Sequence, residues 1–95
     1  MYLVVSRWEP LPGKEKEFEA QGLAARDAIR NTPGVETVMG FTTEDGARIA
    51  IIGYKSKSVY EEIMGDNGAF AKIAAKHQIE NVAKWVRSER GEMVD

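Results

Sequence analysis

The sequence predicts a small α+β domain of the ferredoxin-like type, with its elements in the order β-α-β-β-α-β. Strand-forming segments open and close the chain, and segments rich in helix-forming residues separate them. A hairpin signal, Asp45-Gly46, joins the two middle strands. This order predicts a four-stranded antiparallel sheet with both helices on one face. The length of 95 residues fits a single domain that spans residues 1–95.

The first predicted strand runs over residues 2–9, a segment rich in aromatic and β-branched residues. Side chains alternate between the two faces of a strand, so one face carries Tyr2, Val4, Ser6 and Trp8. The segment Pro10–Gly13 ends the strand, because proline cannot donate a hydrogen bond to a sheet.

A first helix is predicted from Lys14 to Arg30, since this segment consists mainly of Ala, Glu, Lys and Arg. Its apolar stripe recurs at helical spacing and indicates the side that packs on the sheet. The segment Asn31–Gly34 ends the helix, because Pro33 cannot continue it. The stripe consists of Phe18, Gly22, Ala25 and Ile29.

The middle strands are predicted at Val35–Thr43 and Ala47–Lys55. The run Ile49–Ile52 in the later strand is apolar on both faces, as expected for a strand that is covered on both sides. The two helices can cover only one face of the sheet. We therefore expect a homodimer in which the other face packs against a second subunit.

The second helix is predicted to be broken in two. Ser56 is a plausible N-cap, and the segment Gly65–Gly68 interrupts the helix. The later half has an inward stripe of Phe70, Ile73, Ala74 and His77. A final extended stretch is predicted from Gln78 or Ile79 to about Arg90, followed by a tail over residues 91–95.

Composition excludes several classes of function. The formal net charge of −2 and the interleaving of acidic with basic residues argue against a nucleic-acid partner. Without cysteine, no disulfide or thiolate zinc site can form. The N-terminal apolar run Tyr2–Val5 is too short for a signal peptide or a membrane span. We expect a cytoplasmic protein that does not bind membranes.

Three groups of residues resemble one known family, the antibiotic biosynthesis monooxygenase-like (ABM) domain of the dimeric α+β barrel superfamily. Each group lies where one predicted element passes into the next, and together they extend over nearly the whole chain. They are Pro12-Gly13-Lys14 with Glu17-Phe18 after Trp8-Glu9, then Thr32-Pro33-Gly34-Val35, then Tyr54–Tyr60 followed by Phe70 and His77.

The resemblance implies a dimeric α+β barrel with a pocket between the helices and the sheet of each subunit. The family includes quinol and polyketide monooxygenases that need neither a metal nor an organic cofactor, and it also includes haem-degrading enzymes. The haem-degrading branch uses an Asn on the first strand, a Trp on the middle helix and a His on the third helical segment. Of these, only the His has a counterpart, His77; the others fall on or beside Ser6 and near Ile63.

His77 and Ser6 are the candidate catalytic residues. His77 is the only histidine, and imidazole is the side chain that ionises nearest neutral pH. It could remove a proton from a phenol or hydroquinone, or it could ligate haem. The alternative is a histidine that stabilises the end of its helix. Ser6 could donate a hydrogen bond to a ligand on the same strand face.

Aromatic side chains are the candidate ligand-binding residues. Trp8 and Tyr2 could enclose a planar ligand, and Tyr60 and Phe70 could line the mouth of a pocket. Core packing explains the same side chains as well, Phe70 above all. Trp85 is expected in the dimer interface or on a sheet face. The strand arginines Arg7, Arg48 and Arg87 could pair with acidic side chains or bind an anionic substrate, and we expect ion pairs.

The leading hypothesis is a monooxygenase-like oxidoreductase without a cofactor, which acts on a small aromatic or quinol substrate. One alternative is a dimeric module that binds a small hydrophobic ligand without catalysis. Another is a protein that binds or degrades haem through His77.

Overall fold

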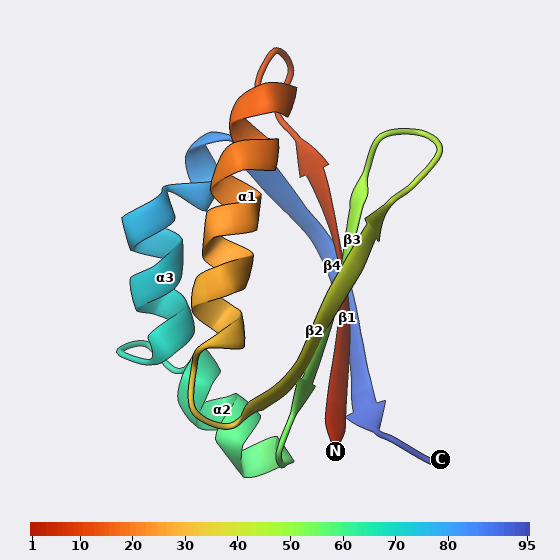
Figure 1. Cartoon of the computed structure of the whole chain (residues 1–95), viewed down its shortest axis with the longest axis vertical. Coiled ribbons are helices and arrows are strands. Elements are labelled where there is room, and N and C mark those ends of the chain that lie inside the picture. Colours follow the sequence, from red (N-terminus) through yellow and green to blue (C-terminus); the bar gives the residue numbers. More distant parts are fainter.

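The computed structural model describes all residues, 1–95, and its elements follow the predicted order (Figure 1). The order β-α-β-β-α-β is confirmed, with the second helix divided into two. The bounds are β1 (Tyr2–Pro10), α1 (Glu15–Arg30), β2 (Val35–Thr42), β3 (Arg48–Tyr54), α2 (Lys57–Met64), α3 (Ala69–His77), the 3-10 helix η1 (Ile79–Asn81) and β4 (Ala83–Glu92).

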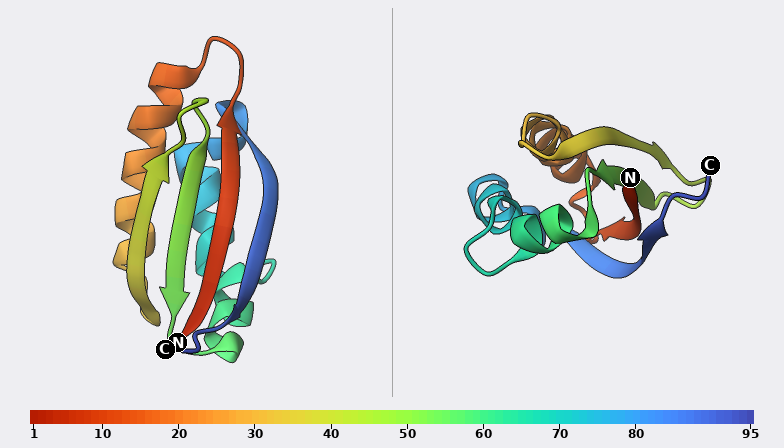
Figure 2. Two further views of the ribbon diagram at one scale, coloured as in Figure 1. Left: turned by 90° about the vertical axis from the view of Figure 1, so that its right-hand side faces the viewer. Right: turned by 90° about the horizontal axis from the view of Figure 1, so that it is seen from below.

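The four strands form one antiparallel sheet in the order β2-β3-β1-β4. All three α-helices cover the same face, and the opposite face carries no helix (Figure 2). This is the predicted ferredoxin-like α+β arrangement. Apolar side chains on the open face are exposed, among them Val5, Met39 and Phe41 at 39%, 51% and 54%. No helix in the structure is both long enough and apolar enough to cross a membrane.

The break between α2 and α3 follows from local sequence. The hydroxyl of Ser56 accepts a hydrogen bond from the backbone N–H of Val59 at 3.2 Å, which confirms the predicted N-cap of α2. Gly65 ends α2, and Gly68 begins α3. A Cβ atom on Gly68 would overlap the carbonyl oxygens of Glu62 and Ile63. Only glycine therefore lets α3 start so close to the end of α2.

The start of the last strand was predicted too early. Gln78 adopts a left-handed conformation, with φ 50° and ψ 43°, and the chain then makes the 3-10 helix η1. β4 begins at Ala83, which pairs with Pro10, and it continues to Glu92, which pairs with Tyr2. The predicted tail therefore starts two residues too early, because β1 offers a partner along its whole length.

A β-bulge interrupts the pairing of β1 with β4. Arg7 pairs with Arg87, whereas the next residue, Trp8, pairs with Trp85. Val86 is the extra residue between these two pairs. A bulge shifts the alternation of side chains by one position. Trp85 and Ser88, three positions apart on either side of Val86, therefore reach the same face, whereas a regular strand would place them on opposite faces.

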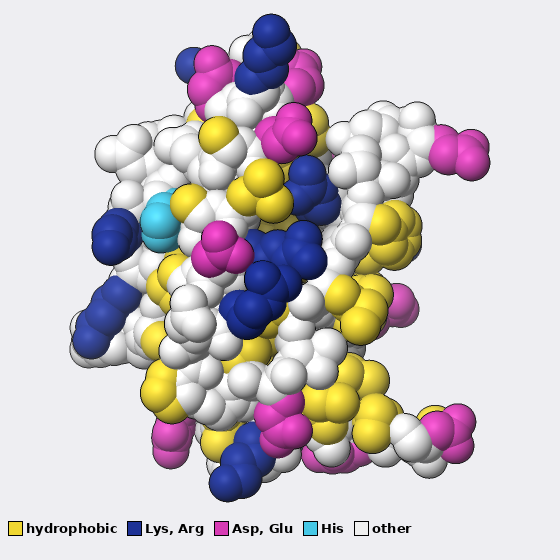
Figure 3. Space-filling model, viewed as in Figure 1, with side chains coloured by type: hydrophobic (Ala, Val, Ile, Leu, Met, Phe, Trp, Pro, Cys, Tyr) yellow, Lys and Arg dark blue, Asp and Glu magenta, His cyan; other side chains and the backbone are white.

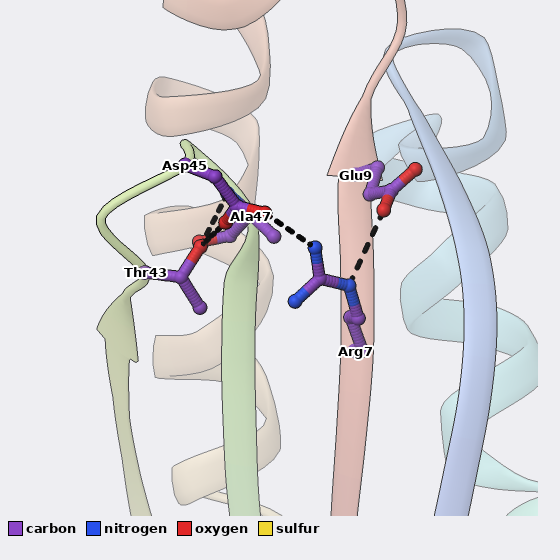
Figure 4. A network of polar contacts seen from close by, with 5 residues as sticks. All are labelled: Arg7, Glu9, Thr43, Asp45 and Ala47. Atoms are coloured by element: carbon purple, nitrogen blue, oxygen red, sulfur yellow. Dashed lines mark hydrogen bonds and ion pairs between the residues drawn. The ribbon is translucent and has the colours of Figure 1, made fainter.

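The turn between β2 and β3 is tied to β1 by a polar network (Figure 4). The hydroxyl of Thr43 donates to the carboxylate of Asp45 and accepts from the N–H of Ala47 at 2.8 Å. The guanidinium of Arg7 lies 3.2 Å from the carboxylates of both Asp45 and Glu9. Hydrogen bonds from Thr43 and Arg7 lower the pKa of Asp45. The expected ion pair of Arg7 is thus present.

The buried core consists of two separate clusters. One contains Phe18, Ala25, Ile79, Val82 and Ala83, and the other contains Tyr2, Val4, Tyr54 and Ile63. Because they do not merge, the space between the helices and the sheet is incompletely filled.

Candidate functional site: a cavity between helices and sheet

A cavity of about 420 Å³ lies between the helices and the sheet. Its volume falls within the range of small-molecule sites. Of its 24 lining residues 18 are hydrophobic, so the wall is mostly apolar. The lining comes from every strand and every α-helix. Its members include Val4, Ser6, Trp8, Phe18, Arg26, Arg48, Tyr54, Tyr60, Phe70, Ile73, Trp85 and Ser88.

A short chain of hydrogen bonds crosses the sheet side of the cavity. The hydroxyl oxygens of Ser6 and Ser88 lie 2.6 Å apart, on paired positions of β1 and β4. The indole N–H of Trp85 donates to the Ser88 hydroxyl at 2.9 Å. Because the Ser88 hydroxyl accepts a hydrogen bond from Trp85, the proton of the Ser88 hydroxyl is free to point toward Ser6. Ser6 can then donate to an oxygen atom of a bound ligand.

Aromatic rings form another part of the wall. Tyr60 lies against two other rings, with its centroid 5.2 Å from Tyr54 and 5.3 Å from Tyr2. The guanidinium of Arg90 lies 5.8 Å from the Tyr60 centroid. Burial, with a smaller effect of Tyr60, raises the pKa of Tyr54 to about 12. Tyr54 therefore stays protonated at neutral pH and offers a neutral hydroxyl.

The only charged residues of the lining are Arg26 and Arg48. No Asp, Glu, Lys or His belongs to it. Arg48 donates from Nε to the hydroxyl of Thr42 at 3.2 Å and lies 5.7 Å from the Phe18 ring centroid. The expected ion pair of Arg48 is absent. The reason is its position on the face that meets the helices, where Phe18 is its neighbour.

The cavity brings together four of the six predicted site residues. Ser6, Trp8, Tyr60 and Phe70 all line it. Tyr2 does not line it; its side chain is buried in the core and its ring packs against that of Tyr60, with the centroids 5.3 Å apart. The roles predicted for these side chains remain predictions.

His77 lies outside the cavity lining. It is the last residue of α3 and is half-buried, and its ring is visible on the surface of the helical layer (Figure 3). Phe70, Ile73 and Ala74 of the predicted stripe do line the cavity. After His77 the left-handed turn at Gln78 directs the chain away, and Ile79 lines this part of the cavity instead. A role for His77 as base or haem ligand therefore has no support from its position.

Sequence reasoning missed Ser88, Trp85 and Arg26 as lining residues, and it expected an ion pair for Arg48. Regular alternation places residues 85 and 88 on opposite faces, and only the bulge at Val86 brings them together. Arg26 could have been found, since it lies four residues after Gly22 on the predicted helix stripe. No cluster of three or more His, Cys, Asp or Glu side chains that could hold a metal ion is present.

Comparison with known proteins identifies structural relatives only. No family model matches the chain, and no curated protein matches it in sequence. Among solved structures, SnoaB, a cofactor-independent oxygenase from Streptomyces nogalater, superposes with a TM-score of 0.79 at 12% identity, over 99% of this chain and 93% of SnoaB. Rv0793 from Mycobacterium tuberculosis gives a TM-score of 0.79 at 19% identity, over 99% and 95%.

A third structure, described as an antibiotic biosynthesis monooxygenase, matches over the full length of both chains with a TM-score of 0.79 and 12% identity. The identities are too low to carry an activity from one chain to the other. Each of the three matches nevertheless covers at least 93% of both chains. The chain therefore has the fold of the antibiotic biosynthesis monooxygenase-like domain, in agreement with the resemblance seen in its sequence.

Proposed function

We propose that this protein is a monooxygenase-like oxidoreductase that acts on a small aromatic or quinol substrate in the cavity, without a metal or organic cofactor. The observation that carries the proposal is the apolar cavity with the Ser6–Ser88–Trp85 hydrogen-bond chain on its wall. The structural similarity to SnoaB, a cofactor-independent oxygenase, supports the reaction class.

The reaction needs no outside reductant, because the substrate supplies the electrons. A hydroquinone and O₂ give a hydroxylated quinone and water, with one oxygen atom in each product. An electron-rich, deprotonated ring reacts with oxygen most readily. The protein's contribution is to exclude water, to hold the ring and to stabilise developing charge on the substrate oxygen through the Ser6 hydroxyl.

Removal of either serine hydroxyl should slow turnover. Loss of one preorganised donor to a developing oxyanion lowers kcat by about 10²–10³-fold where that donor acts directly. We expect a smaller loss for Ser88→Ala than for Ser6→Ala, since Ser88 acts through Ser6. Oxygen uptake with a panel of hydroquinones measures both variants.

Ser58→Ala is the matched control, because Ser58 is exposed and its hydroxyl contacts only Ser56. His77→Gln separates the proposal from a histidine-based mechanism: oxygen uptake should persist in this variant, and its loss would assign the chemistry to His77. Binding of hydroquinones without any oxygen uptake would instead indicate a ligand-binding module.

We also propose a homodimer formed through the open face of the sheet. Met39, Ile51 and Val5 lie side by side in register across β2, β3 and β1. Phe41 and Ile49 pair in the adjacent row. Such a continuous apolar surface is rare on a monomer, and a second copy of the same sheet would cover it.

A further inference from the structure

Of the six arginines of this protein two form ion pairs and four do not, and of these four Arg87 and Arg90 are exposed and lie outside the cavity lining. Arg7 and Arg30 form ion pairs, Arg7 with Asp45 and Glu9 and Arg30 with Asp27. Arg26 and Arg48 form none, although both line an apolar cavity. Positive charge beside an apolar wall is costly to desolvate unless an anion compensates it.

Arg26 is the less satisfied of the two. Its Nε atom is buried and has no hydrogen-bond partner. Arg48, by contrast, uses its Nε to reach Thr42 and stacks near Phe18. No other guanidinium nitrogen of Arg26 forms an ion pair either, so its terminal nitrogens can donate to a ligand in the cavity that the residue lines.

Both side chains lie where α1 approaches β2. Arg48 contacts Phe18 of α1 and Thr42 of β2. Arg30, one turn after Arg26, donates to the carbonyl oxygen of Val38 in β2 at 3.3 Å, so this side of α1 faces β2. Basic side chains follow the line between α1 and β2 on the surface (Figure 3). The positive charge is thus concentrated along one rim of the cavity.

We propose that the cavity selects apolar ring systems that carry a carboxylate, with the carboxylate bound by Arg26 at the rim between α1 and β2. Arg48 adds a second positive charge to the same wall. The rings occupy the apolar interior, toward Ser6 and Ser88. The inference rests on the proposed function, because it assigns the substrate class of the same cavity.

A carboxylate fits these residues better than a neutral polar group does. A guanidinium donates two parallel hydrogen bonds to a carboxylate, and such charge-assisted bonds are the stronger kind. The lining contains no acidic side chain that would repel the anion. An apolar wall also strengthens the attraction, because it lowers the local dielectric constant.

Calorimetric binding of three naphthalene probes tests the inference without turnover. The probes are 2-naphthoate, neutral 2-naphthamide and cationic 2-naphthylmethylamine, each titrated under anaerobic conditions. The wild type should bind the naphthoate about tenfold more tightly than the amide, the value of one charge-assisted hydrogen bond. Arg26→Gln should abolish most of this preference, and Arg48→Gln a smaller part.

Arg30→Gln is the control, because Arg30 lies on the same helix but pairs with Asp27 and Val38. It should keep the preference. Affinity for the amide should be unchanged in all variants, which shows that the cavity is intact. Equal affinity of the wild type for naphthoate and amide, absence of naphthoate binding, or a preference that survives in the Arg26→Gln/Arg48→Gln double variant would overturn the inference.

Oxygen uptake separates this inference from the proposed activity. A preference for the naphthoate in a protein that oxidises no hydroquinone would support the anion site and refute the activity. Oxidation of neutral hydroquinones by a protein with no anion preference would support the activity and refute the anion site.

Discussion

Tyr54 shows how burial decides the chemistry of a single residue. It is 2% exposed at the end of β3 and packs edge-on against Tyr60. Burial, aided by Tyr60, raises the pKa of its hydroxyl from 10.0 to about 12. The folded state thus holds the neutral phenol and disfavours the phenolate. The contribution of the buried Tyr54 hydroxyl to the stability of the folded state is complete below pH 10.0, and it is lost as the pH rises through about 12.

Tyr54→Phe should therefore flatten the alkaline part of the stability curve. Phenylalanine does not ionise, so the free energy of unfolding of the variant should fall less steeply between pH 10 and about 12 than that of the wild type. Denaturant titration at a series of pH values measures both curves. Parallel curves would show that Tyr54 ionises as readily in the folded as in the unfolded chain.

At the scale of the residue, the sequence predicts the side chains that lie on regular elements. Ser6, Trp8, Tyr60 and Phe70 line the cavity because alternation in β1 and helical spacing after Ser56 place them there. The place of Ser88 in the lining could not be predicted, since it depends on a bulge that no residue type in the sequence indicates. His77 continues the stripe of α3 in sequence, but the helix ends at that residue.

At the scale of the element, the break between α2 and α3 is under a tight steric constraint. Gly65 and Gly68 indicate a break in the sequence, and the structure shows why the second glycine is needed. Its Cα faces the last carbonyl groups of α2, where no side chain fits. The course of the chain after α3 was less predictable. The segment 79–82 is short and mixed in polarity, so pattern alone does not distinguish a 3-10 turn from a strand.

Gly68→Ala should destabilise the protein. The added methyl group would overlap two backbone carbonyl groups, which cannot move without shifting a helix, and such overpacking costs about 1–3 kcal/mol. Thermal and denaturant unfolding measure the loss.

Gly22→Ala is the matched control for this substitution. A Cβ at this position of α1 would meet Phe18 at 3.5 Å, an ordinary contact, and Ala favours a helix interior over Gly by about 0.5–1 kcal/mol. The control should be neutral or more stable than the wild type. Equal effects of the two substitutions would contradict the steric account of the break.

At the scale of the whole molecule, the two faces of the sheet differ in what covers them. One face carries the helices and the cavity, and the other exposes Val5, Met39 and Phe41. The sequence predicted this division from the doubly apolar run Ile49–Ile52, because one layer of helices can cover only one face. The cavity was implied only by the family resemblance and not by the residue pattern, since incomplete packing between two clusters leaves no periodic signal.

Phe41→Glu should prevent self-association. A carboxylate buried in the proposed interface would lose its hydration, and the nearest guanidinium in its row, that of Arg7, is already paired with Asp45 and Glu9, so the loss costs several kcal/mol. Analytical ultracentrifugation at micromolar concentration should give a dimer for the wild type and a monomer for the variant.

Leu23→Glu serves as the comparison for this substitution. Leu23 is an apolar side chain of α1 with similar exposure, 46% against 54% for Phe41, but it lies on the helical side of the molecule. This variant should remain dimeric. A monomeric wild type would refute the proposed dimer.

The bulge at Val86 has a consequence for how relatives of this protein can be compared. It acts as an insertion of one residue: a homologue without it would keep the partners of Trp8 and Ser6 on the cavity face, but it would place them two positions apart instead of the three that separate Trp85 and Ser88. A count of residues along β4 alone is therefore wrong by one position beyond the bulge. At identities of 12–19%, site residues on this strand are therefore better matched by their partners on β1 than by their order along the chain.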